Sequence, residues 1–145
     1  PGRDGSIILE IRMEKHRVPM HNTQVDIGVR VETSNLIMDE INKNLYEGKL
    51  VLQTSVGTSV RTFCSNPSGH VVVENDHNVI LANGHAFHDP KYGSNNTNFA
   101  LLVSTVFKEP FKQPNEFAHS ISSLANKLSC GTVIVQKDFV QQKNV

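Results

Sequence analysis

The sequence contains no tryptophan and only two cysteines among its 145 residues. Its 14 basic and 14 acidic residues cancel, so the formal net charge is zero. A nucleic-acid or anionic-membrane surface needs clustered lysine and arginine, so we expect neither kind of partner. No apolar run approaches the roughly 20 residues of a membrane-spanning helix, and no cationic-then-apolar leader is present. These absences predict a cytoplasmic protein.

The common cofactor motifs are also missing. The chain has no Gly-x-Gly-x-x-Gly, no phosphate-binding loop, no Cys-x-x-Cys and no His-Glu-x-x-His. An autonomous nucleotide-binding or zinc enzyme is therefore not expected. His85, His88 and Asp89 lie close together in sequence, but two imidazoles without a second ligand pair are a weak metal motif, and we predict no metal site.

The chain length allows one domain with a substantial core, spanning residues 1–145. The first residue is Pro1 and the first methionine is Met13, which suggests a processed chain or, as we favour, one cut from a longer protein. Residues 1–24 are then a leading connection from a neighbouring domain, and residues 139–145 read as a frayed tail.

The clearest strand signal is the alternation in residues 23–33. Val25, Ile27 and Val29 point to one face, while Asp26 and Arg30 point to the other. The apolar set is expected to face the core. The charged set, which includes Glu32, fits an ion-pair row, a ligand-binding face or an ordinary solvated face.

Further patterns complete an α+β domain, in which a mostly antiparallel or mixed sheet is flanked by two to three helices. Apolar stripes at helical spacing predict helices over 6–17, 35–46 and 114–130. The side chains expected to face the core are Leu36, Ile37, Ile41 and Leu45 in the second helix and Phe117, Ile121, Leu124 and Leu128 in the third. Pro114 suits the first turn of the last helix, and Gly131 suits its end. We expect strands over 49–56, 59–65, 70–75, 78–82, 98–107 and 132–136, with 98–107 central because both its faces are apolar, and a loop over 83–96.

The stretch Arg61–Asn75 is the first candidate for a site. It reads as a hairpin of two strands around an Asn66–Gly69 turn, in which Pro67 presets φ and Gly69 tolerates the left-handed region. Cys64 at the tip is a candidate nucleophile if His70 or His85 acts as its base, but a strand cysteine is more often a small packed hydrophobe.

Several motifs recur in an order that resembles the uncharacterised FAD-dependent dehydrogenase family of two-domain flavoproteins. They are Val25-Asp26-Ile27-Gly28-Val29-Arg30-Val31-Glu32, Arg61-Thr62-Phe63-Cys64-x-Asn66-Pro67-x-Gly69, Val72-Val73-Glu74-Asn75, Asn83-Gly84-His85 and Asn95-x-Thr97-Asn98-Phe99-Ala100-Leu101-Leu102-Val103-Ser104. With later segments the resemblance extends over about residues 1–138. Ser68 stands where the family commonly has glycine.

The resemblance implies the substrate-side or cap domain of an FAD-dependent oxidoreductase, inactive alone because the FAD-binding fingerprint is absent. It implies an FAD-binding domain of the parent chain and a small polar substrate as partners. Gly2, Arg3 and Asn98 would then lie near the cofactor, and Arg61, Asn66, Gly69 and Asn95 near the substrate. Cys64 and His85 remain the catalytic candidates.

Two alternatives stay open. The chain is also compatible with a non-catalytic module that binds a ligand or a protein through the Arg61–Gly69 face. A weaker alternative is a hydrolase centred on Cys64, in which a histidine lowers the pKa of the thiol.

Overall fold

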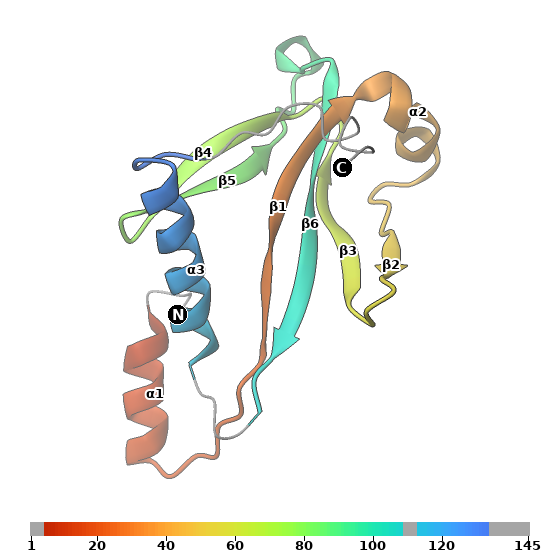
Figure 1. The fold of residues 1–145 in the computed structure, drawn as a ribbon. Coiled ribbons are helices and arrows are strands. Elements are labelled where there is room, and N and C mark those ends of the chain that lie inside the picture. Colours follow the sequence, from red (N-terminus) through yellow and green to blue (C-terminus); the bar gives the residue numbers. More distant parts are fainter. Residues whose placement is uncertain (1–4, 109–112, 134–145) are drawn as a thin grey trace.

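The computed structural model describes residues 5–108 and 113–133. It confirms the α+β class: the described residues form helices and two antiparallel sheets (Figure 1). The predicted Gly2 and Arg3, the tail 139–145 and most of the expected strand 132–136 lie outside the described residues. Thr132 and Val133, which are described, are not in a strand.

The larger sheet has the strand order β1-β6-β3-β2. Its members are β1 (Gln24–Ser34), β6 (Asn96–Val106), β3 (Ser59–Asn66) and β2 (Val51–Gln53). β1 and β6 pair along their whole length, from Gln24 opposite Val106 to Ser34 opposite Asn96. The prediction that the apolar strand following the Asn-rich loop is central is confirmed, because β6 lies between β1 and β3.

The smaller sheet pairs β4 (His70–Asp76) with β5 (Val79–His85). β3 and β4 were expected to form a hairpin, and that prediction is wrong, since the two strands belong to different sheets. The turn itself is present, with Gly69 N donating to Asn66 O at 3.1 Å. Ser68 rather than Gly69 takes the left-handed conformation, with φ of 51°. The chain therefore turns out of one sheet and into the next.

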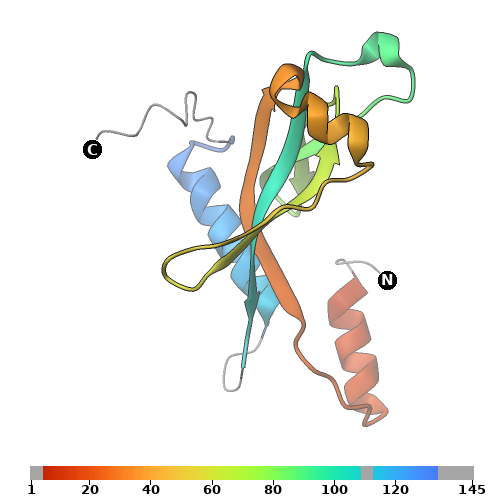
Figure 2. The same cartoon turned by 90° about the vertical axis from the view of Figure 1, so that its right-hand side faces the viewer.

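Three helices accompany the sheets: α1 (Ser6–Lys15), α2 (Asn35–Asn44) and α3 (Pro114–Leu128). Pro114 opens α3 as expected, and Gly131, at φ of 87°, follows its end. α3 contacts β5 and β1. The side chain of Asn126 accepts from Ile80 N at 2.6 Å through Oδ1 and donates to Ile80 O at 2.9 Å through Nδ2. Figure 2 shows α2 across one end of the long strands and α1 set apart from the sheet.

The predicted core is only partly realised. Among the described residues the one buried hydrophobic side chain is Val79, at 4% exposure. Leu36 and Ile37, expected to be buried on α2, are 89% and 71% exposed, and the expected core stripe of α3 is exposed as well. Helical spacing correctly placed these residues on one side of each helix, but that side is only partly covered: Phe117 of α3 lies against Phe107, with ring centres 5.0 Å apart, while Leu36 stays exposed.

The total surface is consistent with this sparse core. The chain of 16.1 kDa exposes 11653 Å², whereas a monomeric protein of this mass exposes roughly 7400 Å². Exposed large hydrophobic side chains, among them Leu36, Val56 and Leu128, contribute to this area.

Candidate functional site

The four-stranded sheet has two chemically different faces. The β1–β6 register and the alternation of side chains put Asp26, Arg30, Asn98 and Ser104 on one side, which we call the polar face. The side chains of Val29 and of the other odd-numbered residues of β1 lie on the other side, which we call the apolar face. The sequence predicted this division along β1, and pairing extends it across the sheet.

A β-bulge in β3 decides which of its side chains reach the polar face. Pairing with β6 shifts register between Phe63 and Asn66, and Cys64 within the bulge has φ of 49°. One extra residue reverses the in–out alternation beyond it. Asn66, opposite Asn98, therefore points to the polar face instead of the apolar one. Nothing in the sequence marks Cys64 as a bulge residue.

At the centre of the polar face lies a hydrogen-bonded group that we call the Arg30–Asn98 cluster: Arg30, Cys64, Asn66 and Asn98. Arg30 donates to Asn98 Oδ1 from Nε at 2.9 Å and from Nη2 at 2.5 Å. Arg30 Nη2 also donates to Cys64 O at 2.9 Å. Asn66 Nδ2 donates to the same carbonyl at 2.9 Å and to Asn98 Oδ1 at 3.4 Å. The cluster thus joins β1, β3 and β6.

The smaller sheet closes over this cluster through Gly84 of β5. A Cβ at position 84 would lie 1.6 Å from Arg30 Nη2 and 2.3 Å from Asn98 Oδ1. Only glycine allows the backbone of β5 to approach so closely. Asn98 is 0% exposed as a result of this packing around β6.

Further along the polar face a second group remains accessible. Arg61 Nη2 and Asp26 Oδ2 form an ion pair at 2.7 Å, with side-chain exposures of 29% and 28%. Ser104 donates to the other oxygen of Asp26 at 2.5 Å. The guanidinium of Arg61 also lies 5.1 Å from the ring centre of Phe63. The three charged residues of β1 therefore differ in their surroundings: Asp26 pairs with Arg61 of β3, Arg30 belongs to the cluster, and Glu32 is exposed.

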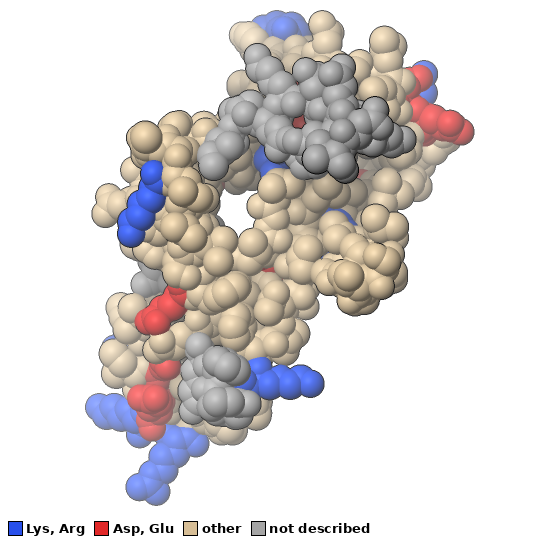
Figure 3. Space-filling model, viewed as in Figure 1, with Lys and Arg blue, Asp and Glu red and all other residues tan. Residues whose placement is uncertain are grey.

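The space-filling view shows an opening through the molecule. In the orientation of Figure 1 it lies between α3 and β1, with basic side-chain atoms visible near its upper edge (Figure 3).

The predicted substrate residues fall in two places. Arg61 and Asn66 both lie on the polar face. Gly69 is buried in the turn after β3, where its carbonyl accepts from Ser94 Oγ at 2.5 Å. Asn95 is exposed, and its carbonyl accepts from Asn35 N at 2.9 Å. The structure therefore brings two of the four together, and it adds Asp26 and Arg30 to them.

The catalytic candidates Cys64 and His85 are not in hydrogen-bond contact. In the described part of the chain, the only hydrogen-bond partner of the Cys64 thiol is Asn66 Nδ2, at 3.9 Å. His85 is exposed at the end of β5, with its ring 5.0 Å from Phe87 in an edge-on arrangement. His70 accompanies the same aromatic residue and contacts the carbonyl of Tyr92 at 2.8 Å. A Cys64–histidine nucleophile gains no support from these positions.

The loop after β5 is held by local contacts and carries no metal group. Within residues 5–108 and 113–133, no three His, Cys, Asp or Glu side chains are arranged to hold a metal ion. Asp89 lies 2.9 Å from Lys91, and hydrogen bonding to Asp89 and Tyr92 raises the pKa of Lys91.

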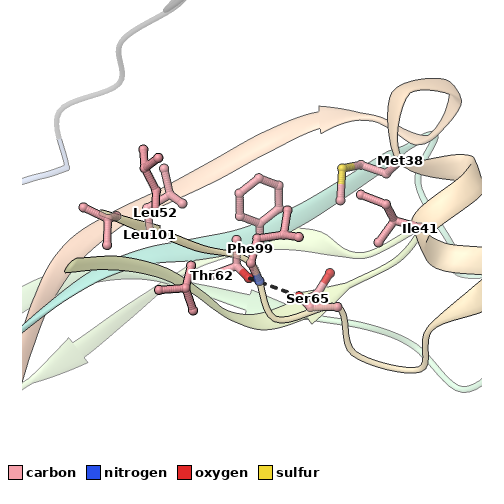
Figure 4. A pocket seen from close by; sticks show the side chains of 11 residues that line it. Met38, Ile41, Leu52, Thr62, Ser65, Phe99 and Leu101 are labelled. Atoms are coloured by element: carbon pink, nitrogen blue, oxygen red, sulfur yellow. Dashed lines mark hydrogen bonds between the residues drawn. The ribbon is translucent and has the colours of Figure 1, made fainter. Parts of the chain in front are cut away.

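The apolar face carries a groove of about 350 Å³, which we call the apolar groove (Figure 4). Met38 and Ile41 of α2 form one wall, and side chains of β2, β3 and β6 form the floor. Thr62 at its edge accepts from Leu50 N at 2.8 Å. Thr97, fully buried, joins α2 to the sheet: it donates to Asn35 Oδ1 at 2.7 Å and accepts from Asn42 Nδ2 at 2.9 Å.

Asn98, which was predicted to contact the cofactor, is enclosed in this structure. It is fully buried, with Gly84 packed against it, so a flavin ring has no room beside its amide. No helix among those described is long and apolar enough to cross a membrane. In comparisons with known proteins, no family model matches the chain and no curated protein matches it.

Proposed function

We propose that this chain is the substrate-side domain of an FAD-dependent oxidoreductase, a dehydrogenase that binds its cofactor on a separate domain. The observation that best supports this proposal is the pairing of Gln24 with Val106, which puts the start of β1 and the end of β6 side by side. A domain inserted into a host must enter and leave it at neighbouring points. Residues 24–106 have that geometry, and the ordered motifs described above supply the flavoprotein assignment.

In this proposal the polar face meets the substrate. Arg61, Asp26 and Ser104 offer a cation, an anion and a hydroxyl on three adjacent strands, which suits a small polar substrate. Rigid strands hold these groups, and the Arg30–Asn98 cluster fixes the spacing of the strands behind them. FAD would supply the redox chemistry, while the residues of this chain bind and orient the substrate.

The apolar face would then receive the cofactor-binding domain of the parent chain. Its groove and the edge strand β2, with Leu52 65% exposed, form a continuous uncovered apolar surface. One side of a standard protein interface buries roughly 800 Å², and a surface that includes a groove and a sheet edge suits a folded domain better than a short peptide.

Visible absorption tests the proposal. A purified longer protein that contains this chain should show flavin absorption bands at about 450 nm. The 145-residue chain mixed with FAD should show no tight binding. A longer protein without flavin would remove the oxidoreductase assignment. The alternative, a non-catalytic module that binds a ligand or a protein through the Arg61–Gly69 face, would then take first place.

A further inference from the structure

The sequence contains a single Asn-Gly pair, Asn83-Gly84, which lies in β5. In such a pair the backbone nitrogen of the glycine can attack the side-chain amide carbon of the asparagine, because glycine has no Cβ to hinder the approach. The attack closes a succinimide ring and expels ammonia. Whether a folded chain allows this reaction depends on whether the glycine nitrogen is free and whether the asparagine side chain lies beside it.

The pairing of β4 with β5 does not use the amide of Gly84. The two strands are joined by a two-residue turn in which both residues have positive φ, 51° and 64°. In such a hairpin the closing pair, Asp76 and Val79, exchanges hydrogen bonds, and alternate pairs beyond it do not. Gly84 lies opposite Val71 in one of the pairs without these bonds. Ile80 has the same kind of position, and its N–H and carbonyl bond a side chain of α3 instead.

The side chain of Asn83 is held beside this free amide. Gly84 N donates to Asn83 Oδ1 at 2.8 Å, so the Cγ bonded to that oxygen lies no more than about 4 Å from the nitrogen. Asn83 Nδ2 donates to Glu74 Oε1 at 2.9 Å, and this charge-assisted bond keeps the carboxamide in the same orientation. Asn83 is half-buried and Glu74 is exposed, so water reaches the reacting groups. Reacting atoms that are held close together react faster.

We propose that Asn83 is a site of spontaneous deamidation. Gly84 N loses its proton to hydroxide and forms a bond to Asn83 Cγ. The bond from Cγ to Nδ2 breaks, and the nitrogen leaves as ammonia. One water molecule then opens the ring at either carbonyl and leaves aspartate or isoaspartate at position 83, so the sequence of steps needs no oxidant or reductant.

The product should loosen β5 from the Arg30–Asn98 cluster. The new carboxylate faces Glu74 instead of donating to it, and like charges on neighbouring strands repel. Isoaspartate also lengthens the backbone just before Gly84, where even an added Cβ would lie 1.6 Å from Arg30 Nη2 and 2.3 Å from Asn98 Oδ1. The reaction requires only this chain, so its failure and the failure of the flavin test are separate results.

Incubation of the 145-residue chain in ¹⁸O-labelled water tests the site. The buffer is mildly alkaline, so that the attacking nitrogen loses its proton more readily, and peptides are mapped by mass spectrometry. We expect labelled oxygen to enter at Asn83 at least about tenfold faster than at Asn78, which corresponds to about 1.4 kcal/mol in activation free energy. Asn78 precedes Val79, whose branched side chain hinders the same attack. Equal labelling of both residues would overturn the proposal. So would an intact Asn83 in the folded chain while the urea-denatured chain reacts.

A matched pair of variants tests the consequence for β5. Asn83→Gln keeps an amide but would have to close a larger ring, so labelling at position 83 should disappear. Asn78→Gln makes the same change in the turn and should leave labelling of Asn83 intact. After incubation, hydrogen–deuterium exchange of β5 should be faster in the unaltered chain, in proportion to the converted fraction, and unchanged in Asn83→Gln. Unchanged exchange in a fully converted chain would contradict the loosening of β5. Labelling of the unaltered chain decides the reaction itself even if a variant does not fold.

Discussion

The two faces of the four-stranded sheet differ in how far other parts of the chain cover and hydrogen-bond their side chains. On the polar face, Arg30 and Asn98 are covered by β5 and held by several hydrogen bonds. On the apolar face, Leu52 and Val29 are more than half exposed. Side chains that water solvates well are thus enclosed, while those that water solvates poorly are open. This inversion indicates that internal contacts stabilise the polar face, whereas the apolar face is shaped for something outside the described chain.

The largest effect should come from removing the centre of the polar face. Arg30→Ala leaves Asn98 Oδ1 and Cys64 O without their strongest donors inside a closed contact. We expect a loss of about 2–4 kcal/mol in the free energy of unfolding, measured by urea denaturation. A loss below about 0.5 kcal/mol, the range of ordinary surface substitutions, would show that the cluster does not stabilise the sheet.

Thr97→Val tests the junction where α2 meets the sheet. The substitution keeps the shape of the side chain but removes the hydroxyl that bonds Asn35 and Asn42. Because Thr97 is fully buried, we expect a destabilisation of about 1–2 kcal/mol. Thr105→Val on the same strand is the control and should change stability less. Equal effects of the two substitutions would argue against a special role for this junction.

Arg61→Ala separates binding from folding on the open part of the polar face. The Asp26–Arg61 pair is partly exposed, so its loss should cost no more than about 1 kcal/mol of stability. In the proposed flavoprotein, turnover should nevertheless fall about tenfold, which corresponds to about 1.4 kcal/mol of lost binding to the transition state. Lys91→Ala, which removes a cation from the loop, should leave turnover intact. Unchanged kinetics for Arg61→Ala would exclude Arg61 from the substrate site.

The smallest effect on stability should come from the apolar face. Leu52→Asn removes a large hydrophobic side chain that is 65% exposed, so unfolding of the isolated chain should change by less than about 0.5 kcal/mol. Analytical ultracentrifugation should show less self-association than for the unaltered chain, because β2 is an exposed apolar edge strand. A large loss of stability would show that the apolar face is covered in the isolated chain.

Sequence patterns predicted where the helices and strands lie better than which of their sides are buried. The alternation of apolar and polar residues identified β1 and its two faces. The apolar residues on both faces of the strand predicted over 98–107 correctly indicated that β6 is central. Helical spacing found α2, but not that Leu36 would be exposed, because periodicity says which residues share a side and not whether another element covers it.

The site was only partly predictable for a related reason. Arg61 and Asn66 were expected at a hairpin tip, but the bulge at Cys64 and the change of sheet after Asn66 depend on how distant strands pair. Arg30 was expected only as a member of the charged row of β1, for which an ion-pair row, a ligand-binding face and a solvated face all stayed open. The place of Arg30 in the cluster depends on the pairing of β1 with β6. That pairing puts Asn98 opposite Glu32 and brings its Oδ1 within 2.9 Å of Arg30 Nε.

Hydrogen–deuterium exchange compares the two faces most directly. The exchange of β2 and α2 would be measured in the isolated chain and in a longer flavin-containing protein that includes it. The account predicts slower exchange at Val51–Gln53 and around Met38 in the longer protein, with little change at the already enclosed Asn98. Identical exchange of β2 and α2 in both proteins would contradict the claim that the apolar face receives a cofactor-binding domain.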